Sequence, residues 1–213
     1  LAAQSSVPLS TEKFYKSSSN NLLSSIKVFD IARELSLPVL YASSSAVYGN
    51  LQIGDDISND CDILTPYALD KWTLEAYAKL SNNLYSVPSI GFRFFNIYGP
   101  YQDPSNPYSG VISVFLSQSL KCEELEVFGG NQTRDFIHVA NICEIIEIAI
   151  KKLLDPKYTS AEVLNLGTGN SISILNLAHK IKHIVNSESP VKLLPEVDGD
   201  PKQSNGVYNK LTT

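Results

Sequence analysis

The stretch LPVLYASSSAVYG, residues 37–49, decides how the rest of the chain is interpreted. Four apolar residues follow Pro38, and three consecutive serines come directly after them. A short apolar run that begins at a proline predicts a buried strand, over residues 37–43. Because ligands bind at the carboxyl ends of strands in parallel sheets, the serines place hydroxyl groups where a site would lie.

The segments on either side of this strand predict helices. Residues 20–35 carry apolar side chains three or four positions apart, as an amphipathic helix does. Thr65 as N-cap and Pro66 at the first helical position predict a second helix, which runs to about Leu80. SIGFRFF, residues 89–95, predicts the next buried strand. Strand, helix and strand at this spacing are typical of a parallel α/β sheet.

In the second half of the chain, the expected helices and strands alternate less regularly. Prolines and glycines predict a loop over residues 98–110, after which helices are expected over 111–121, 140–154 and 174–185, the last capped by Ser173. Short strands are expected at 125–128 and 162–169. The tail from Pro195 onward is polar and predicts irregular, exposed structure.

Composition excludes several classes of protein. The chain has 213 residues, is 43% hydrophobic and 18% charged, and carries a net charge of −5 without a basic block, so no nucleic-acid partner is expected. No apolar run approaches the ~20 residues of a membrane span, so no membrane partner is expected. Cys61, Cys122 and Cys143 are odd in number and widely spaced, which favours free thiols in the cytoplasm over disulfides or a zinc site.

Tyr67 and Lys71 form the first candidate for chemistry. They lie four residues apart on one helix face, where a cation and the positive helix terminus favour a phenolate and hence a general base. A Tyr-x-x-x-Lys pair arises often by chance, and an ordinary exposed pair is the alternative. Ser43 to Ser45 and Asn96, just past two strand ends, together with Arg134, which suits a phosphate, favour the functional interpretation.

Seven segments carry a resemblance to a known family: LAAQSSV, YASSSAVYG, TPYALDK, RFFNIYGP, GVISVF, VFGGNQTRDFIHV and LNLGTG. In this order, from Leu1 to about Gly169, they resemble extended short-chain dehydrogenase/reductases of the NAD-dependent nucleotide-sugar epimerase/dehydratase family. The resemblance implies an α/β fold, a Rossmann-type parallel sheet lacking its first strands. Residues 1–100 and 135–169 would be the C-terminal part of the NAD-binding domain, and residues 101–134 and 170–213 a smaller substrate-binding domain.

The resemblance also implies the roles of individual residues. Tyr67 would be the catalytic base, Lys71 would lower its pKa and bond the nicotinamide ribose, and Ser44, ahead of Ser43 and Ser45, would be the catalytic serine. The residues implied for NAD binding are Leu1, Ala2, Ala3, Asn20, Ser43, Tyr67, Lys71 and Phe95. Those implied for substrate binding are Asn96 and Arg134 at the diphosphate, Phe128 at the nucleotide base, Val111, and Ser204 beside the sugar.

The chain departs from the family pattern at both ends. The glycine-rich phosphate loop, the first strand and the acidic ribose ligand have no counterpart. The chain begins at Leu1 and contains no methionine, so we expect a fragment of a longer protein. The family's Arg-x-Gly-Asp stands here as Val197-Asp198-Gly199-Asp200, without the arginine.

The expected activity is NAD-dependent 4-epimerisation of a UDP-hexose or UDP-N-acetylhexosamine through a 4-keto intermediate. Ser45 and Ala46 stand where the family's dehydratases and decarboxylases carry acids, which disfavours both reactions. A nucleotide-sugar reductase of the same family stays open as an alternative. A non-catalytic sugar-nucleotide-binding protein is the alternative from a different class.

Two further expectations concern assembly and metals. The resemblance implies a homodimer through helices 20–35 and 66–80, with Leu23, Val28 and Leu74 as outward apolar residues. His179 and His183 lie four residues apart on a helix without a nearby carboxylate, so a solvated helix face and no metal site is the interpretation.

Overall fold

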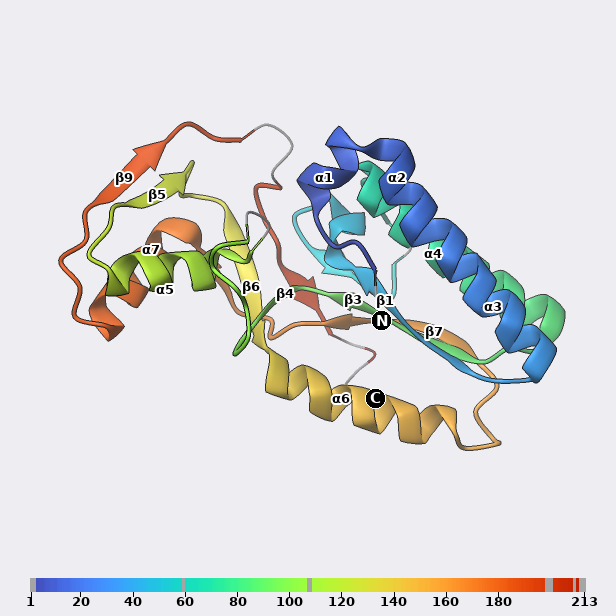
Figure 1. The fold of residues 1–213 in the computed structure, drawn as a ribbon. Helices are drawn as coiled ribbons and strands as arrows, with labels where there is room; N and C mark the ends of the chain where they lie inside the picture. Colours follow the sequence, from blue (N-terminus) through green and yellow to red (C-terminus); the bar gives the residue numbers. More distant parts are fainter. Residues whose placement is uncertain (1–2, 59, 107–108, 198–200, 209, 211–213) are drawn as a thin grey trace.

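The computed structural model describes residues 3–58, 60–106, 109–197, 201–208 and 210, which form an α/β fold of two lobes (Figure 1). The larger lobe contains a parallel sheet of three strands in the order β1-β3-β7. These strands are β1 (Val39–Ser44), β3 (Ser89–Phe94) and β7 (Ala161–Leu166), and each neighbouring pair is in register over its whole length. The parallel α/β sheet expected from the sequence is thereby confirmed.

Helices cover both faces of this sheet (Figure 1). Helices α3 (Ser24–Leu35) and α4 (Pro66–Tyr85) pack on one face, and α6 (Val139–Leu153) packs on the other. Strand side chains alternate between the two layers, since Tyr41 packs with α3 and α4 whereas Phe92 packs with α6. Both faces are therefore buried, which is why these strands have nearly continuous apolar sequences.

Leu74 was expected on an outward face of α4, and this was wrong. Its side chain is only 4% exposed and belongs to the core formed with Phe29, Val39 and Ala78. The apolar residues of α4 point in several directions, so the sequence did not show which of them face the sheet.

The helical segment before α3 is longer than the sequence predicted. It comprises α1 (Val7–Glu12), α2 (Phe14–Ser18) and a π-helical turn η1 (Ser19–Leu23). Ser10 of α1 is fully buried, and its hydroxyl accepts a hydrogen bond of 3.2 Å from the Tyr67 backbone N–H at the start of α4. The N-terminal helices therefore pack directly on the start of α4.

The smaller lobe is built around two helices and a short parallel pair of strands (Figure 1). Its elements are α5 (Val111–Leu120), β5 (Leu125–Phe128), α7 (Ile174–Ile184) and β9 (Val191–Leu194). Ser173 caps α7 as predicted, accepting a hydrogen bond of 3.2 Å from Asn176 N–H. A second three-stranded sheet, β4 (Asn96–Tyr98), β6 (Thr133–His138) and β8 (Ser171–Ser173), lies between the two lobes (Figure 1).

The expectation of an exposed, irregular tail was wrong for residues 204–208, which are half-buried, whereas Lys202 and Gln203 are exposed as expected. Strand β10 (Gly206–Val207) pairs in parallel with β2 (Gly54–Asp55). The Tyr208 ring lies 5.8 Å from the ring of Phe95. Backbone pairing between two polar segments some 150 residues apart leaves no local hydrophobic pattern, so the sequence did not predict it.

A buried ion pair connects the central strand to α4. Arg93 of β3 donates two hydrogen bonds to Glu75, of 2.9 and 2.6 Å, and these side chains are only 6% and 8% exposed. Arg93 also donates to the Tyr48 hydroxyl at 2.8 Å, at the end of the 3₁₀ turn η2 (Ser45–Tyr48), and Tyr48 donates to Asn165 of β7 at 2.7 Å. This chain of hydrogen bonds crosses the layers of the larger lobe and gives both buried charges partners.

Candidate active site

The local structure brings Ser44, Tyr67 and Lys71 together. Thr65 caps α4 as predicted, accepting a hydrogen bond of 3.2 Å from Ala68 N–H, so Tyr67 lies in the first turn. Lys71 follows one turn later, with its Nζ 5.6 Å from the centroid of the Tyr67 ring. The hydroxyl of Ser44, at the end of β1, lies close enough to the Tyr67 phenol to lower its pKa. Strand end and helix start thus meet at one point.

Among the three serines, Ser44 is the one whose hydroxyl acts on the phenol. Its Oγ also accepts a hydrogen bond of 3.2 Å from Ala46 N–H, which orients the hydroxyl at the start of η2. The Ser43 hydroxyl points to the other side of the strand and donates to buried Glu75. The Ser43 side chain is therefore engaged with Glu75, and its expected contact with NAD stays a prediction.

Burial dominates the electrostatic environment of Tyr67. It raises the pKa of Tyr67 above its ordinary value of 10.0, and the Ser44 hydroxyl offsets this only in part. The Lys71 ammonium donates to the Ala42 carbonyl at 2.7 Å. Desolvation is thus the main influence on the pKa of Tyr67, and the expected lowering of this pKa by Lys71 stays a prediction.

Lys71 itself is buried and 5% exposed. Burial lowers its pKa from 10.5 to about 8, and the nearby Asp70 carboxylate opposes this shift. An ammonium has three N–H donors, and within the described part of the chain the Ala42 carbonyl is the acceptor found for it. The remaining donors suit the hydroxyls of a ribose, which is the group that Lys71 is expected to bind.

The structure describes only part of the segment that is expected to bind the cofactor. Leu1 and Ala2 are outside the described residues, and Ala3 is exposed. The next residue, Gln4, is held in place by two hydrogen bonds between its backbone and one asparagine side chain, of 2.9 and 3.0 Å.

That asparagine is Asn21, which the sequence interpretation missed. Asn21 is 4% exposed, whereas Asn20, the residue expected to contact the cofactor, is exposed. The signal was present in the spacing, because Asn21 lies four residues after buried Ser17 and eight before buried Phe29, on one helix face. We therefore propose that Asn21 positions the segment expected to lie along NAD.

Phe95 and Asn96 occupy the end of the central strand. Phe95 is 5% exposed and packs against the rings of Tyr48 and Tyr208, at centroid distances of 6.4 and 5.8 Å. Asn96 is exposed and begins β4. These two residues lie where the larger lobe passes into the sheet between the lobes.

Arg134 and Ser204 meet at the returning tail. Arg134 Nη1 donates hydrogen bonds of 2.7 Å to the carbonyls of Thr133 and Pro201. Ser204 is half-buried, and its carbonyl accepts a hydrogen bond of 2.8 Å from the Ser171 hydroxyl. The expected diphosphate ligand thus already contacts the segment that carries the expected sugar contact.

Val111 and Phe128 belong to the smaller lobe. Val111 is the first residue of α5 and is half-buried against the core of that lobe, and Phe128 ends β5 with 44% of its surface exposed. Among the described residues no hydrogen bond or ring contact joins either of them to Ser44, Tyr67 or Lys71. Their expected roles in substrate binding stay predictions.

Asp135 and Tyr208 form a buried contact that the sequence interpretation missed. Asp135 is fully buried and accepts the backbone N–H groups of Thr168 and Gly169, at 2.9 and 2.8 Å, and the Tyr208 hydroxyl. Burial, with a smaller contribution from Asp135, raises the pKa of Tyr208. The alternation along β6, where Asp135 and Ile137 point inward, was the signal for a buried aspartate.

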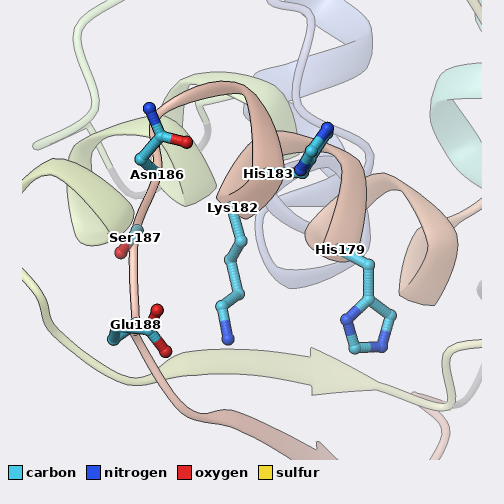
Figure 2. A pocket seen from close by; sticks show the side chains of 6 residues that line it. All are labelled: His179, Lys182, His183, Asn186, Ser187 and Glu188. Carbon is cyan, nitrogen blue, oxygen red and sulfur yellow. The ribbon is translucent and has the colours of Figure 1, made fainter.

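A hollow of about 310 Å³ lies away from this site, on the C-terminal half of α7 (Figure 2). Its lining residues are His179, Lys182, His183, Asn186, Ser187 and Glu188. Both histidines are exposed, which confirms the solvated helix face, and their rings extend in different directions (Figure 2). Within the described ranges, no group of three or more His, Cys, Asp or Glu is arranged to hold a metal ion.

The lowered pKa of Lys71 predicts how stability depends on pH. Between pH 8 and 10 the unfolded state binds more protons than the folded state, so the free energy of unfolding should rise with pH. Relative to Lys71→Met, which cannot titrate, the gain should be on the order of 2 kcal/mol across this window. Urea unfolding at four pH values measures it, with exposed Lys79→Met as the matched control. Parallel profiles for the unaltered protein and Lys71→Met would contradict the prediction.

Comparison with known proteins places this geometry in a family. A family model described as "NAD dependent epimerase/dehydratase family" matches residues 1–167. A Methanocaldococcus jannaschii protein with the provisional name UDP-glucose 4-epimerase is 35% identical over 186 residues, which are 85% of this chain and 58% of that protein. A UDP-N-acetyl-alpha-D-glucosaminuronate decarboxylase from Bacillus cytotoxicus is 32% identical over 204 residues, 92% of this chain and 61% of that protein.

Solved structures show the same fold. The UDP-N-acetylglucosamine 4-epimerase from Methanobrevibacter ruminantium M1, in complex with UDP-N-acetylmuramic acid, superposes with a TM-score of 0.88 at 34% sequence identity. The superposition covers 100% of this chain and 67% of that one. The chain spans about three-fifths of the length of the curated relatives it matches. From the family match over most of its length and these relatives, the chain belongs to the NAD-dependent epimerase/dehydratase family.

Proposed function

We propose that this protein catalyses the NAD-dependent 4-epimerisation of a UDP-hexose or UDP-N-acetylhexosamine. The observation that carries the proposal is the meeting of Ser44, Tyr67 and Lys71 at the end of β1, without a carboxylic acid at the two positions after Ser44. Relatives named as UDP-glucose and UDP-N-acetylglucosamine 4-epimerases support the choice of reaction.

The residues present fit one end of NAD. The free donors of buried Lys71 suit the nicotinamide ribose, Phe95 lies at the neighbouring strand end, and Asn21 holds the segment that includes Ala3. NAD bound there would supply the hydride chemistry at the sugar C4. The sequence contains no Gly-x-Gly-x-x-Gly motif, so we assign no residue of this chain to the pyrophosphate.

The side chains of the site move the proton. Tyr67 takes the proton of the 4-hydroxyl as a general base, and Ser44 holds the 4-oxygen and relays the proton to the phenol. Because burial raises the pKa of Tyr67, the phenolate needs positive charge close to the ring. Lys71, with a pKa of about 8, supplies an ammonium at neutral pH, and the 4-keto sugar turns before Tyr67 returns the proton.

The substrate lies between the lobes in this proposal. Asn96 and Arg134 hold the diphosphate, whereas Val111 and Phe128 line the nucleotide end from the smaller lobe. Arg134 is near the lobe junction with one nitrogen bound to the Pro201 carbonyl, which directs its guanidinium. Ser204 then lies beside the sugar.

A decarboxylase is the second candidate, because one relative carries that name at 32% identity. It ranks lower since Ser45 and Ala46 cannot act as acids. A reductase would consume reduced cofactor, whereas an epimerase leaves the net redox state unchanged. A non-catalytic binding protein would bind UDP-sugars without turning them over.

We propose a cytoplasmic location for the protein from the state of its cysteines. Cys61, Cys122 and Cys143 are all free, which suits a cytoplasmic protein. Across the described residues, no helix is both long and apolar enough to cross a membrane.

Tyr67→Phe tests the base. Only a hydroxyl is lost, so the fold should be kept while turnover of UDP-sugars falls by ~10²-fold or more. Steady-state kinetics of the intact protein with NAD measure this, with Tyr77→Phe on the same helix as control. Normal turnover by Tyr67→Phe would refute the mechanism.

Ser204→Tyr tests the sugar pocket. A small residue beside the sugar 2-position leaves room for an N-acetyl group, so the unaltered protein should accept UDP-GlcNAc. A tyrosine should exclude it by steric clash, lowering kcat/KM by ~10²-fold, while UDP-glucose turnover stays within about threefold. If Ser204→Tyr still takes UDP-GlcNAc, Ser204 does not set the size limit.

We further propose a homodimer through α3 and α4. Apolar side chains on these helices and at the end of η1, directly before α3, remain exposed, including Leu23 at 62%, Val28 at 52% and Leu84 at 61%. An isologous pairing of the two helices would remove these side chains from water.

Sedimentation velocity at micromolar concentration tests the dimer. The intact protein should sediment as a dimer, and Leu23→Glu with Val28→Glu should convert it to a monomer by placing charges in an apolar interface. Ile148→Glu is the matched control, because this residue of α6 is equally exposed, at 65%, on the other side of the sheet. A monomer for the unaltered protein would contradict the proposal.

A further inference from the structure

We propose that Tyr208 is a positioning residue for nucleotide-sugar binding, which holds the C-terminal strap, residues 201–208, across the junction of the two lobes. The inference rests on the proposed function. In Figure 1 the dark red strap lies near the junction of the two lobes, and its strand β10 pairs with β2.

The strap is bound by its backbone from both sides. On the side of β6 and β8, its carbonyls accept hydrogen bonds from Arg134, Thr133 and Ser171, of 2.7, 3.1 and 2.8 Å. On the side of the larger lobe, they accept from the Gly54 N–H and the Asn165 side chain, both at 2.8 Å. Main-chain carbonyls occur at every residue, so these bonds alone do not choose a register for the strap.

The side chain of Tyr208 fixes the register of the strap. Its ring packs on Phe95 at 5.8 Å, and its hydroxyl donates to the fully buried carboxylate of Asp135. A hydrogen bond to a buried charged acceptor is among the stronger ones in a protein. Tyr208 therefore fixes which residues of the strap face the lobe junction.

Two glycines leave space for this arrangement. A Cβ atom on Gly167 would lie 2.1 Å from the Tyr208 hydroxyl oxygen, and one on Gly206 would lie 2.5 Å from the Phe95 ring. Neither distance is sterically possible without movement of the rings or the backbone. Two segments distant in sequence are thus shaped around the same pair of rings.

The strap connects to the groups proposed to bind substrate. It carries Ser204, it is held by Arg134, and its ring contact supports Phe95 directly before Asn96. The groups proposed for chemistry, in contrast, lie on β1 and α4. Loosening the strap should therefore weaken substrate binding without changing the proton transfer, which raises KM and leaves kcat nearly unchanged.

Tyr208→Phe in the intact protein with NAD tests this inference. It removes only the hydroxyl, and Asp135 keeps the N–H groups of Thr168 and Gly169 as partners, so the fold should be kept. We expect KM for UDP-GlcNAc and Kd for UDP to rise about tenfold, with kcat within about twofold. Gly167→Ala should raise KM in the same way, by displacing the hydroxyl. Tyr101→Phe is the matched control, because its side chain is fully exposed.

The outcomes separate this inference from the proposed function. Turnover by the unaltered protein, with unchanged KM and Kd in Tyr208→Phe, would overturn the inference and leave the proposed function standing. A fall in kcat at unchanged KM would also overturn it, since a purely structural role reduces the active fraction. UDP binding without turnover, weakened in Tyr208→Phe, would refute the epimerase but support the inference. If the unaltered protein binds no UDP, both are overturned.

Discussion

The buried ion pair between Glu75 and Arg93 is the interaction on which the rest of the larger lobe depends. It joins α4 to the central strand with two hydrogen bonds. Ser43, near the end of β1, donates a hydrogen bond to the same carboxylate. Removing one partner of such a pair leaves a buried charge uncompensated, at a cost of about 3–5 kcal/mol. Through Tyr48 the network continues to β7. The hydrogen bonds therefore fix the positions of α4, the three strands of the sheet and the turn η2 relative to one another.

That arrangement explains the chemistry of the site. Because Glu75 holds α4 against the strand ends, Tyr67 and Lys71 on the same helix are forced into a buried position beside Ser44. Burial then acts on both groups, raising the pKa of Tyr67 and lowering the pKa of Lys71 to about 8. Burial thus disfavours the charged form of each group relative to water, although Lys71, with a pKa of about 8, stays mostly protonated at neutral pH.

Much of the site could be predicted from the sequence because its signals are local. Thr65 and Pro66 mark the helix start, the four-residue spacing places Tyr67 and Lys71 on one face, and the serines follow an apolar run that predicts a buried strand. Such signals need no more than a dozen neighbouring residues. The family resemblance added the roles of these residues, and the family match agrees with it.

Tertiary structure decided what depends on distant partners. The sequence alone determined the parallel sheet and the capped helix, since periodicity and capping are properties of short segments, whereas the grouping of Ser44 with Tyr67 followed from the family resemblance. Only the fold showed that Asn21 rather than Asn20 is buried, that Leu74 faces the core, and that Tyr208 returns to Asp135. Burial and desolvation arise when segments far apart in the chain come together, so a local periodicity shows which residues share a face but not what covers that face.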